Sequence, residues 1–300
     1  MTNVYKINLF RWDFSERDKC NEYCIQQNYI GWGWPEGNPE KVKNISDHYK
    51  SPKNTLKTAV KRIENMKVGD LCWTYGADKK WYLGKITGEE YECGPVRATH
   101  PAIGMLRACE WHEVKNFDLI PGEIVCRSHN DKTIRCVTEN MSTPDDYVTY
   151  CQLLYDNPDE TKNISLDFWS LTHPDDLEDM VGLYLQTHGY YIFPSTNKRG
   201  TKDYEFRLVR SDGNKEAIVQ CKNNADIPLD DLENTYTKEE IYILSIKGNH
   251  SPKYTSPWEM GWQSEDSRIK IFDAEKLKFW AQENIKIMPK RIQKFLELSK

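Results

Sequence analysis

The sequence lacks any long hydrophobic run. No apolar stretch approaches the ~20 residues that a membrane-spanning helix needs. The opening residues, MTNVYKINLFRWDFSERD, contain no apolar segment that ends at a small-residue cleavage site. Nine cysteines are present, an odd number at irregular spacings, which favours reduced thiols over a disulfide framework. These absences predict a cytoplasmic protein with no signal peptide and no membrane anchor.

An excess of positive charge is also missing. The chain has 41 Lys and Arg against 46 Asp and Glu, a formal net charge of −5. Nucleic-acid phosphates are usually contacted by Lys and Arg, so no global field indicates a polyanionic partner. Local basic patches remain compatible with this count, and a metal-dependent enzyme needs carboxylates. Net charge therefore neither supports nor excludes a nucleic-acid function.

Several catalytic motifs are absent. No Gly-x-Ser-x-Gly elbow and no His-Glu-x-x-His pair occur, which argues against a hydrolase of the serine-elbow type and against a common class of zinc protease. The glycines at 31, 33 and 37 are interleaved with tryptophans and are not followed by Gly-Lys-Ser/Thr, so they do not predict a nucleotide-phosphate loop.

The length and composition that are present indicate about two folded domains. The chain has 300 residues, of which 38% are hydrophobic and 29% charged. In the N-terminal part, alternating and helical patterns predict strands at 4–10, 71–75, 81–86, 111–114 and 124–125, with helices at 15–27 and 56–66. We interpret residues 1–137 as an α+β domain, a small curved β-barrel with two helices.

The second half of the chain predicts a different architecture. Residues 138–172 contain Pro144, Pro158 and many polar residues, and we interpret them as a connector with a short helix at 145–154. From 173 to 300 a helix at 175–187 precedes strands at 190–193, 203–209, 216–221, 241–246 and 268–272, and a helix at 274–283 follows. This order predicts an α/β sandwich.

Four polar residues of this second domain form a candidate catalytic group. Glu178 lies on the first helix, and Asp203 lies at the entry to a strand after Gly200. Gln220 and Lys222 are two residues apart on the next strand, so their side chains leave the same face. A turn through Ser-Asp-Gly-Asn at 211–214 brings the two strands together. The four side chains are therefore expected to converge.

These residue types suit phosphodiester hydrolysis. A divalent cation polarises the phosphoryl oxygen and acidifies a water molecule, and Mg²⁺ prefers oxygen ligands. Asp203, the Gln220 side-chain oxygen and the Cys221 backbone carbonyl are the candidate ligands of Mg²⁺ or Mn²⁺. Lys222 can orient the attacking water or stabilise charge on the phosphate, and Glu178 can hold a further water or a second metal. The alternative is that Glu178 is a solvated helix residue and Lys222 an exposed strand end.

At this point the sequence resembles a known family. The segments LEDMVGLYLQTHGYYIFPS, KRGTKDYEF and EAIVQCKNN are similar to the Mrr-type branch of the PD-(D/E)xK restriction nucleases, over about residues 173–285. The resemblance implies Mg²⁺-dependent DNA cleavage, with Asp203, Gln220 and Lys222 as the core and Glu178 in support. The approach to Asp203 contains a single glycine where the family usually has two, so Asp203 and Glu205 both remain candidates for the metal ligand.

Three basic residues precede this position. Lys198, Arg199 and Lys202 are candidates for contacts with the DNA phosphates beside the scissile bond. The alternative is that they form a solvated loop.

Large aromatic residues are concentrated in the N-terminal domain. The candidates for an aromatic cage that holds a modified base are Trp32, Trp34, Trp73, Tyr75, Trp81 and Trp111. Residues 1–135 contain a Gly-Trp-Gly segment, followed by KVGDL, WYLGKITG and Trp111. This pattern is similar to the EVE and YTH-like group of PUA-type barrels. The resemblance implies modified-base recognition. The alternative is that most of these rings form the core of the barrel.

Together the two resemblances imply a modification-dependent restriction endonuclease with a role in antiviral defence. Its partner would be double-stranded DNA that carries modified bases, and a homodimer is expected because cutting both strands needs two active sites. Two alternatives stay open. The barrel could sense RNA or a small molecule, or the chain could be a non-catalytic nucleic-acid reader with a degenerate nuclease fold.

Overall fold

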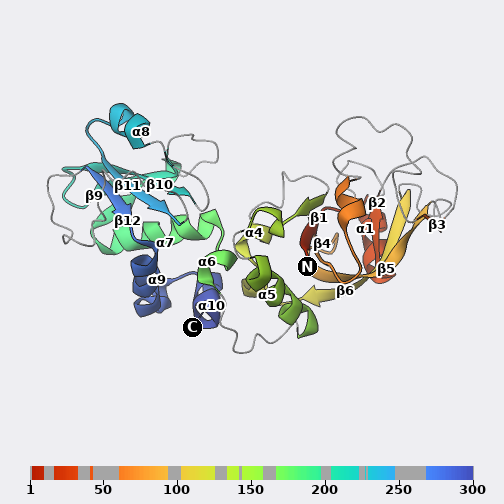
Figure 1. Ribbon diagram of the computed structural model, residues 1–300. Coiled ribbons are helices and arrows are strands. Elements are labelled where there is room, and N and C mark those ends of the chain that lie inside the picture. Colours follow the sequence, from red (N-terminus) through yellow and green to blue (C-terminus); the bar gives the residue numbers. More distant parts are fainter. Residues whose placement is uncertain are drawn as a thin grey trace. The chain divides into compact units, whose positions relative to one another are not determined.

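The computed structural model describes residues 2–9, 17–32, 41–42, 61–93, 103–125, 134–141, 144–157, 167–196, 204–222, 227, 229–246 and 268–299. The chain divides into two compact units, Met1–Ser170 with Leu298–Lys300, and Leu171–Glu297. Each unit has one mixed β-sheet with helices packed on it (Figure 1), which is compatible with the predicted α+β and α/β class. Within these ranges, no helix combines the length and the apolar character needed to cross a bilayer.

The sheet of the first unit has seven strands in the order β2-β6-β5-β4-β1-β7, and β3 pairs with β5 off this path. The strands are β1 (Val4–Ile7), β2 (Tyr29–Trp32), β3 (Lys41–Val42), β4 (Leu71–Tyr75), β5 (Trp81–Cys93), β6 (Met105–Val114) and β7 (Ile134–Cys136). Among the described strands, β2 and β7 stand at the two ends and do not pair with each other. This part of the chain therefore forms an open sheet, and the predicted PUA-like barrel is not confirmed.

The helical segments of the first unit are short except for two. They are α1 (Arg17–Gln26), a helical stretch at 61–65, η1 (Phe117–Leu119), α4 (Gly122–Val125), η2 (Thr138–Asn140), α5 (Pro144–Asp156) and α6 (Phe168–Leu171), the last at the boundary between the units. The strand predicted at 124–125 is wrong. Both residues lie in α4, whose backbone N–H groups at Ile124 and Val125 donate to the Pro121 carbonyl at 2.9 and 3.2 Å. The fixed φ of the proline favours this helical turn over an extended one.

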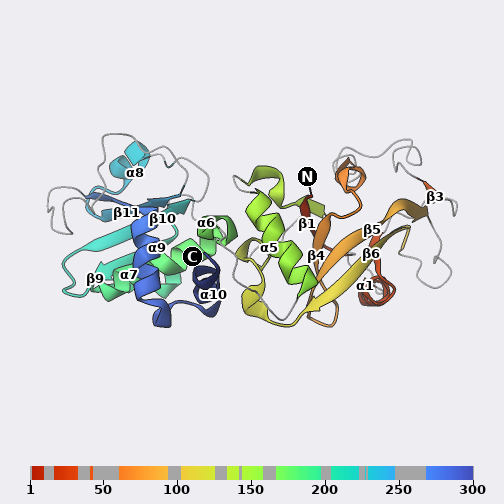
Figure 2. The ribbon, with the colours of Figure 1, turned by 60° about the horizontal axis from the view of Figure 1, so that its bottom comes forward.

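Helix α5 belongs to the first unit and not to a linker. It packs against β4 and β5 (Figure 2) and buries Tyr147, Tyr150, Cys151 and Leu154. The Tyr150 hydroxyl donates to the Leu119 carbonyl at 2.6 Å. The segment expected as a connector at 138–172 thus contributes a helix to the core of the first unit.

The sheet of the second unit has five strands in the order β12-β11-β10-β9-β8. Its strands are β8 (Tyr190–Ile192), β9 (Phe206–Arg210), β10 (Glu216–Lys222), β11 (Glu240–Ser245) and β12 (Ile269–Phe272). Strands β8, β9 and β10 are antiparallel, and β10, β11 and β12 are parallel. The helical segments are α7 (Pro174–Thr187), η3 (Pro194–Thr196), α8 (Leu229–Thr235), α9 (Ala274–Glu283), η4 (Ile285–Ile287) and α10 (Lys290–Leu298).

Helices cover both faces of this second sheet. Figure 1 shows α8 on one side and α7 and α9 on the other. On the α8 side, Leu232 packs with Ile218 of β10 and Ile243 of β11. On the other side, Tyr184 of α7 lies against Phe272 of β12 with ring centroids 5.3 Å apart. The layers agree with the predicted sandwich, while its assignment to the nuclease fold is part of the proposal below.

The start of α7 is fixed by a capping box and a buried ion pair. The His173 side chain accepts a hydrogen bond from the Asp175 N–H, and the His173 N–H donates to Asp176 at 3.0 Å. Asp176 is fully buried, and the Arg291 Nε of α10 donates to its carboxylate at 3.0 Å. These contacts fix the first turn of α7, and thereby the position of Glu178 one turn later.

Candidate functional site

The register of the β9–β10 hairpin places Glu205 opposite Gln220. Phe206 pairs with Val219, and the Glu205 N–H donates to the Val219 carbonyl at 2.7 Å, which extends the pairing by one residue. The turn contains Gly213 at φ 73°, a left-handed conformation that glycine adopts without strain. Glu205 and Gln220 therefore lie on one face at neighbouring strand positions.

Glu205 forms a hydrogen-bonded group with both residues of the Gln-x-Lys pair. The Gln220 Nε2 donates to Glu205 Oε1 at 2.7 Å, and the Lys222 Nζ donates to the same oxygen at 3.1 Å. Gln220 is 3% exposed, whereas the side chain of Lys222 is 41% exposed. The group thus has a buried amide and a partly exposed ammonium joined by one carboxylate.

Glu178 approaches this group from α7, the helix on the opposite face of the sheet. The pKa of Glu178 is raised to about 8, first by burial and then by the negative charge of Glu205, while Lys222 lowers it. Glu178 therefore lies within electrostatic range of both side chains. Lys222 is the last residue of β10, so its contact with Glu205 lies at the end of this strand.

Not all of the predicted site residues fall within the described ranges. Asp203, Lys198, Arg199 and Lys202 lie outside them. The Cys221 thiol is buried, which raises its pKa. Because carbonyls alternate along a strand, the Cys221 carbonyl points to the same side as the Val219 carbonyl, toward β9. The structure therefore brings Glu205, Gln220 and Lys222 into contact, with Glu178 in electrostatic range, and the strand residue in this group is Glu205, the other candidate for the metal ligand.

The donor atoms of this group fit a hard divalent cation. Carboxylate, amide and backbone carbonyl oxygens are the ligands that Mg²⁺ and Mn²⁺ prefer, while zinc favours Cys and His. The Gln220 Nε2 points at Glu205, which leaves its Oε1 as an acceptor. Within the described residues no three His, Cys, Asp or Glu side chains cluster in a way that could hold a metal ion. A metal here would depend on two carboxylates together with amide and carbonyl oxygens.

The aromatic residues predicted as a cage are mostly core residues. Trp73 is fully buried, and Trp32, Trp81 and Trp111 are between 2% and 8% exposed; Tyr75 is 42% exposed. Trp34 lies outside the described residues. The described part of the first unit thus shows mainly the packing role that the sequence left open as an alternative.

These rings also lie on two faces of the first sheet. Trp32 and Trp111 belong to a core cluster with Cys72 and Cys109. Trp73, next to Cys72 on β4, points to the other face, where its indole interacts with the Cys151 thiol of α5. Since one face cannot share a cage with the other, the described rings do not converge on a single pocket.

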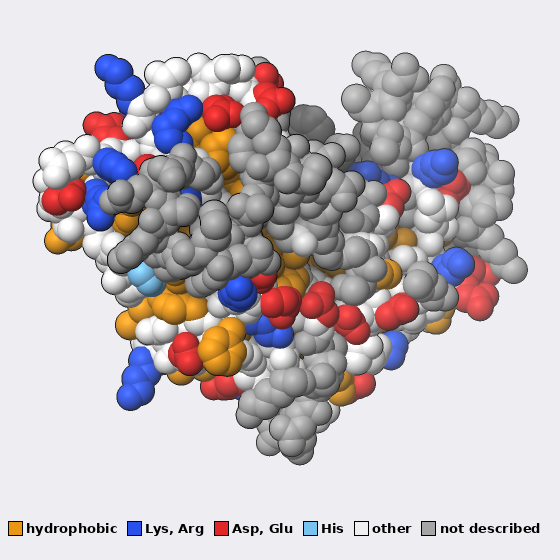
Figure 3. Space-filling view, turned by 60° about the vertical axis from the view of Figure 1, so that its left-hand side comes forward, with side chains coloured by type: hydrophobic (Ala, Val, Ile, Leu, Met, Phe, Trp, Pro, Cys, Tyr) orange, Lys and Arg blue, Asp and Glu red, His pale blue; other side chains and the backbone are white. Residues whose placement is uncertain are grey.

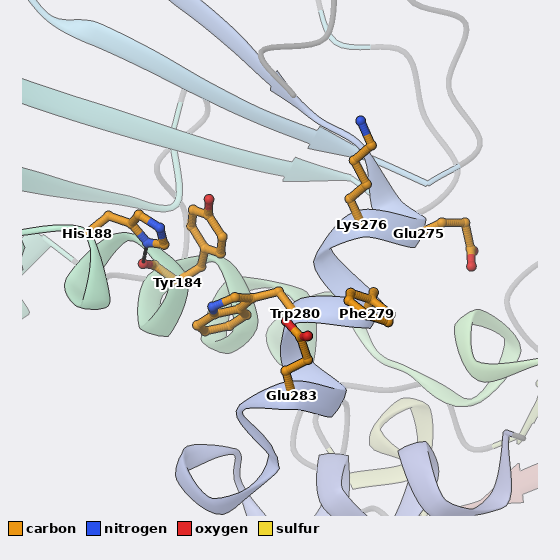
Figure 4. A pocket seen from close by; sticks show the side chains of 7 residues that line it. All are labelled: Tyr184, His188, Glu275, Lys276, Phe279, Trp280 and Glu283. Atoms are coloured by element: carbon orange, nitrogen blue, oxygen red, sulfur yellow. Dashed lines mark hydrogen bonds between the residues drawn. The ribbon is translucent and has the colours of Figure 1, made fainter. Parts of the chain in front are cut away.

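A separate pocket lies between α7 and α9 (Figure 4). Its volume is about 560 Å³, and its lining residues are Tyr184, His188, Glu275, Lys276, Phe279, Trp280 and Glu283. His188 stacks on Tyr184 with centroids 4.1 Å apart, and Trp280 meets the same ring edge-on at 4.8 Å. None of the Glu178–Glu205–Gln220–Lys222 group lines this pocket, so it is distinct from the candidate site.

The face of the molecule drawn in Figure 3 has side chains of both charges. In the view of Figure 3, Lys and Arg side chains of the described residues are interspersed with Asp and Glu and form no continuous basic band on that face. Comparison of the chain with models of protein families, with curated proteins and with solved structures finds no match. The functional assignment therefore depends on the side chains of the site.

Proposed function

We propose that this protein is a divalent-metal-dependent nuclease that hydrolyses phosphodiester bonds of DNA. The observation that carries the proposal is the contact of Glu205 with both Gln220 and Lys222, with the Glu178 carboxyl in electrostatic range. A carboxylate and an amide oxygen can hold a divalent cation, and an ammonium can stabilise negative charge on a phosphate, so this group suits metal-assisted phosphodiester hydrolysis.

Each residue of the group has a defined role in this proposal. Glu205 supplies the carboxylate ligand on the strand, with the Gln220 side-chain oxygen and the Cys221 carbonyl beside it. A bound Mg²⁺ or Mn²⁺ supplies Lewis acidity at the phosphoryl oxygen. Lys222 positions the attacking water and stabilises the negative charge that develops on the phosphate. Glu178 holds a water molecule at the edge of the site.

The reaction is a simple hydrolysis. The oxygen of water forms a bond to phosphorus as one phosphate ester bond breaks. The proton released by that water passes to solvent, and the departing oxygen takes up a proton. No redox partner is needed. Asp203 remains the alternative strand ligand, and Lys198, Arg199 and Lys202 remain candidates for phosphate contacts.

The biological setting belongs to the same proposal. We place the protein in the cytoplasm, as a homodimer that cuts double-stranded DNA in a restriction or antiviral role, with the first unit selecting DNA that carries modified bases. What supports the last point is Trp32, which is 2% exposed and whose indole Nε1 has no hydrogen-bond partner among the described residues. A buried donor of this kind can be satisfied by an acceptor on a ligand.

The nuclease proposal is tested by incubating supercoiled plasmid with the full chain and Mg²⁺ or Mn²⁺. We expect cleavage by the wild type and at least a 100-fold lower rate for Glu205→Gln and Lys222→Met. Glu216→Gln and Lys238→Met are the matched controls, because both residues are exposed and lie at the other end of the sheet. Cleavage that persists in Glu205→Gln and Lys222→Met would show that this group is not the active site. Cleavage that is equally rapid in EDTA would show that the reaction does not depend on a divalent metal.

Base selection is tested by binding. We compare the affinities of Lys222→Met protein for three duplexes of one sequence, which are unmodified, methylated or hydroxymethylated. Trp32→Phe removes the indole N–H together with part of the ring, and Trp169→Phe, at another buried position of the same unit, is the control for the loss of ring volume. Equal affinity for all three duplexes would reject modified-base selection and leave the nuclease proposal intact.

A further inference from the structure

The pocket between α7 and α9 is lined by aromatic and charged side chains. Its volume of about 560 Å³ lies within the range of roughly 300–1,000 Å³ for small-molecule sites. We refer to it as the α9 pocket. The residues that line it, as far as the structure describes them, are Tyr184, His188, Glu275, Lys276, Phe279, Trp280 and Glu283. This described lining contains no aliphatic side chain and no amide.

Packing holds several rings of the α9 pocket in place. Tyr184 is 1% exposed and lies at its base. His188 stacks on the Tyr184 ring with an angle of 15° between the planes, and its Nδ1 lies 2.7 Å from the Tyr184 carbonyl oxygen. Trp280 meets the Tyr184 ring edge-on, at an angle of 70°. Because these rings are already ordered, a ligand loses little free energy to their rearrangement.

Phe279 and Trp280 supply the accessible aromatic surface of the α9 pocket. Phe279 is 60% exposed, and Trp280 is partly exposed. The face of an aromatic ring carries partial negative charge and attracts a cation that lies within ~6 Å of its centre. Tryptophan attracts cations more strongly than the other aromatic side chains do. This surface therefore favours a ligand with a positive charge.

Carboxylates stand next to these rings. Glu283 follows Phe279 by four residues and Trp280 by three, so the three side chains are neighbours on the surface of α9. Glu275 precedes Phe279 by four residues and lies on the same side of the helix. Figure 4 shows the Glu283 carboxylate beside Trp280, whereas Lys276 extends away from the rings. The charge next to the rings is therefore negative, and it adds to their attraction for a cation.

The same lining argues against other ligands. Two carboxylates against one ammonium repel a phosphate or another anion. An amphipathic helix places its apolar face in a hydrophobic groove, and the described lining has no aliphatic side chain to form one. A nucleobase is recognised through donors and acceptors on its edge, for which the lining provides no amide. A primary ammonium has three N–H donors to satisfy, whereas a fully methylated ammonium has none.

We propose that the α9 pocket binds a small organic cation with a methylated ammonium group. The methyl groups pack against Phe279 and Trp280, whose rings attract the positive charge, and the Glu283 carboxylate balances it. The α9 pocket contains none of the residues of the candidate nuclease site, so its occupancy does not depend on the nuclease proposal.

Calorimetric titration of the full chain with choline chloride tests whether the positive charge is required. Neohexanol, in which an uncharged carbon replaces the choline nitrogen, has nearly the same shape and is the comparison ligand. At constant ionic strength we expect the wild type to bind choline about 10-fold more tightly than neohexanol. Equal affinities would show that the pocket selects apolar shape alone and would overturn the proposal. Absence of choline binding would overturn it as well.

Two variants test whether choline binds in this pocket. Glu283→Gln removes a charge at constant size, and Phe279→Leu removes an aromatic face at an exposed position. We expect each to weaken choline binding about 3- to 5-fold, and Glu283→Gln to leave neohexanol binding unchanged. Glu90→Gln and Phe117→Leu, at exposed positions of the first unit, are the matched controls. Choline binding that is unchanged in both Glu283→Gln and Phe279→Leu would place the cation elsewhere and reject the α9 pocket.

Discussion

The raised pKa of Glu178 predicts that the stability of the metal-free protein falls as pH rises. The carboxyl has a pKa of about 8 in the folded chain, against an ordinary value of 4.5, because it is partly buried and close to Glu205. Between these two values the unfolded chain has lost its proton while the folded chain retains it. Stability associated with Glu178 is therefore complete below about pH 4.5 and is lost as pH rises to about 8.

The size of this effect follows from the same numbers. At about 1.4 kcal/mol per pH unit, a pKa raised from 4.5 to about 8 corresponds to at most ~5 kcal/mol. Glu178 is only partly buried, so screening by water reduces this figure, and we expect roughly 2–5 kcal/mol. In Glu178→Gln the amide cannot ionise. The variant should match the wild type near pH 5 and exceed its free energy of unfolding by that amount near pH 9.

Urea denaturation in EDTA, followed by circular dichroism at pH 5, 7 and 9, measures the difference. The control is Glu283→Gln, an exposed glutamate of α9, whose difference from the wild type should not change with pH. A Glu178→Gln difference that is the same at pH 5 and pH 9 would refute the argument. It would mean that Glu178 ionises in the folded chain as it does in water.

Three further predictions concern the packing that supports the two units. Arg291→Met should destabilise the second unit by about 3–5 kcal/mol in urea denaturation, because Asp176 would remain buried without its cation; a loss below 1 kcal/mol would contradict this. Trp73→Ala should lower the stability of the first unit by about 3–5 kcal/mol, and an unchanged melting temperature would show that the ring is not core. Gly84→Ala should cost about 1–3 kcal/mol or more by the same measurement, since its Cβ would lie 2.5 Å from the Trp111 ring; a neutral effect would require that ring to move freely.

Local patterns predicted much of the second unit. The helix at 175–187 and the strands on either side of the 211–214 turn appear in the structure within three residues of their predicted ends. Alternation and a glycine turn are properties of short segments, so the sequence contains them directly. The hairpin also contained the information on Glu205. Counting outward from the turn pairs Glu216 with Val209 and, by the same step, Gln220 with Glu205.

Long-range packing accounts for what the sequence did not predict. Alternation shows that Trp73 and Cys72 point to opposite faces, but it does not show which face is covered. Helix α5 covers the Trp73 face and begins more than 60 residues later, so no local pattern indicates that this ring is buried. The buried Asp176–Arg291 pair likewise joins residues 115 positions apart. The cage was predicted without knowledge of these long-range contacts.

The four-residue loop from Ser211 to Asn214 constrains how this chain can vary in length. One inserted residue there would shift β10 by one position against β9 and turn the Gln220 amide toward α7, since neighbouring side chains face opposite sides. The carboxylate of Glu205 and the amide would then be separated by the thickness of the sheet, although both strands could still form. Substitutions in this loop are therefore tolerable where Gly213 is kept, while a change in its length would give a folded protein without the group.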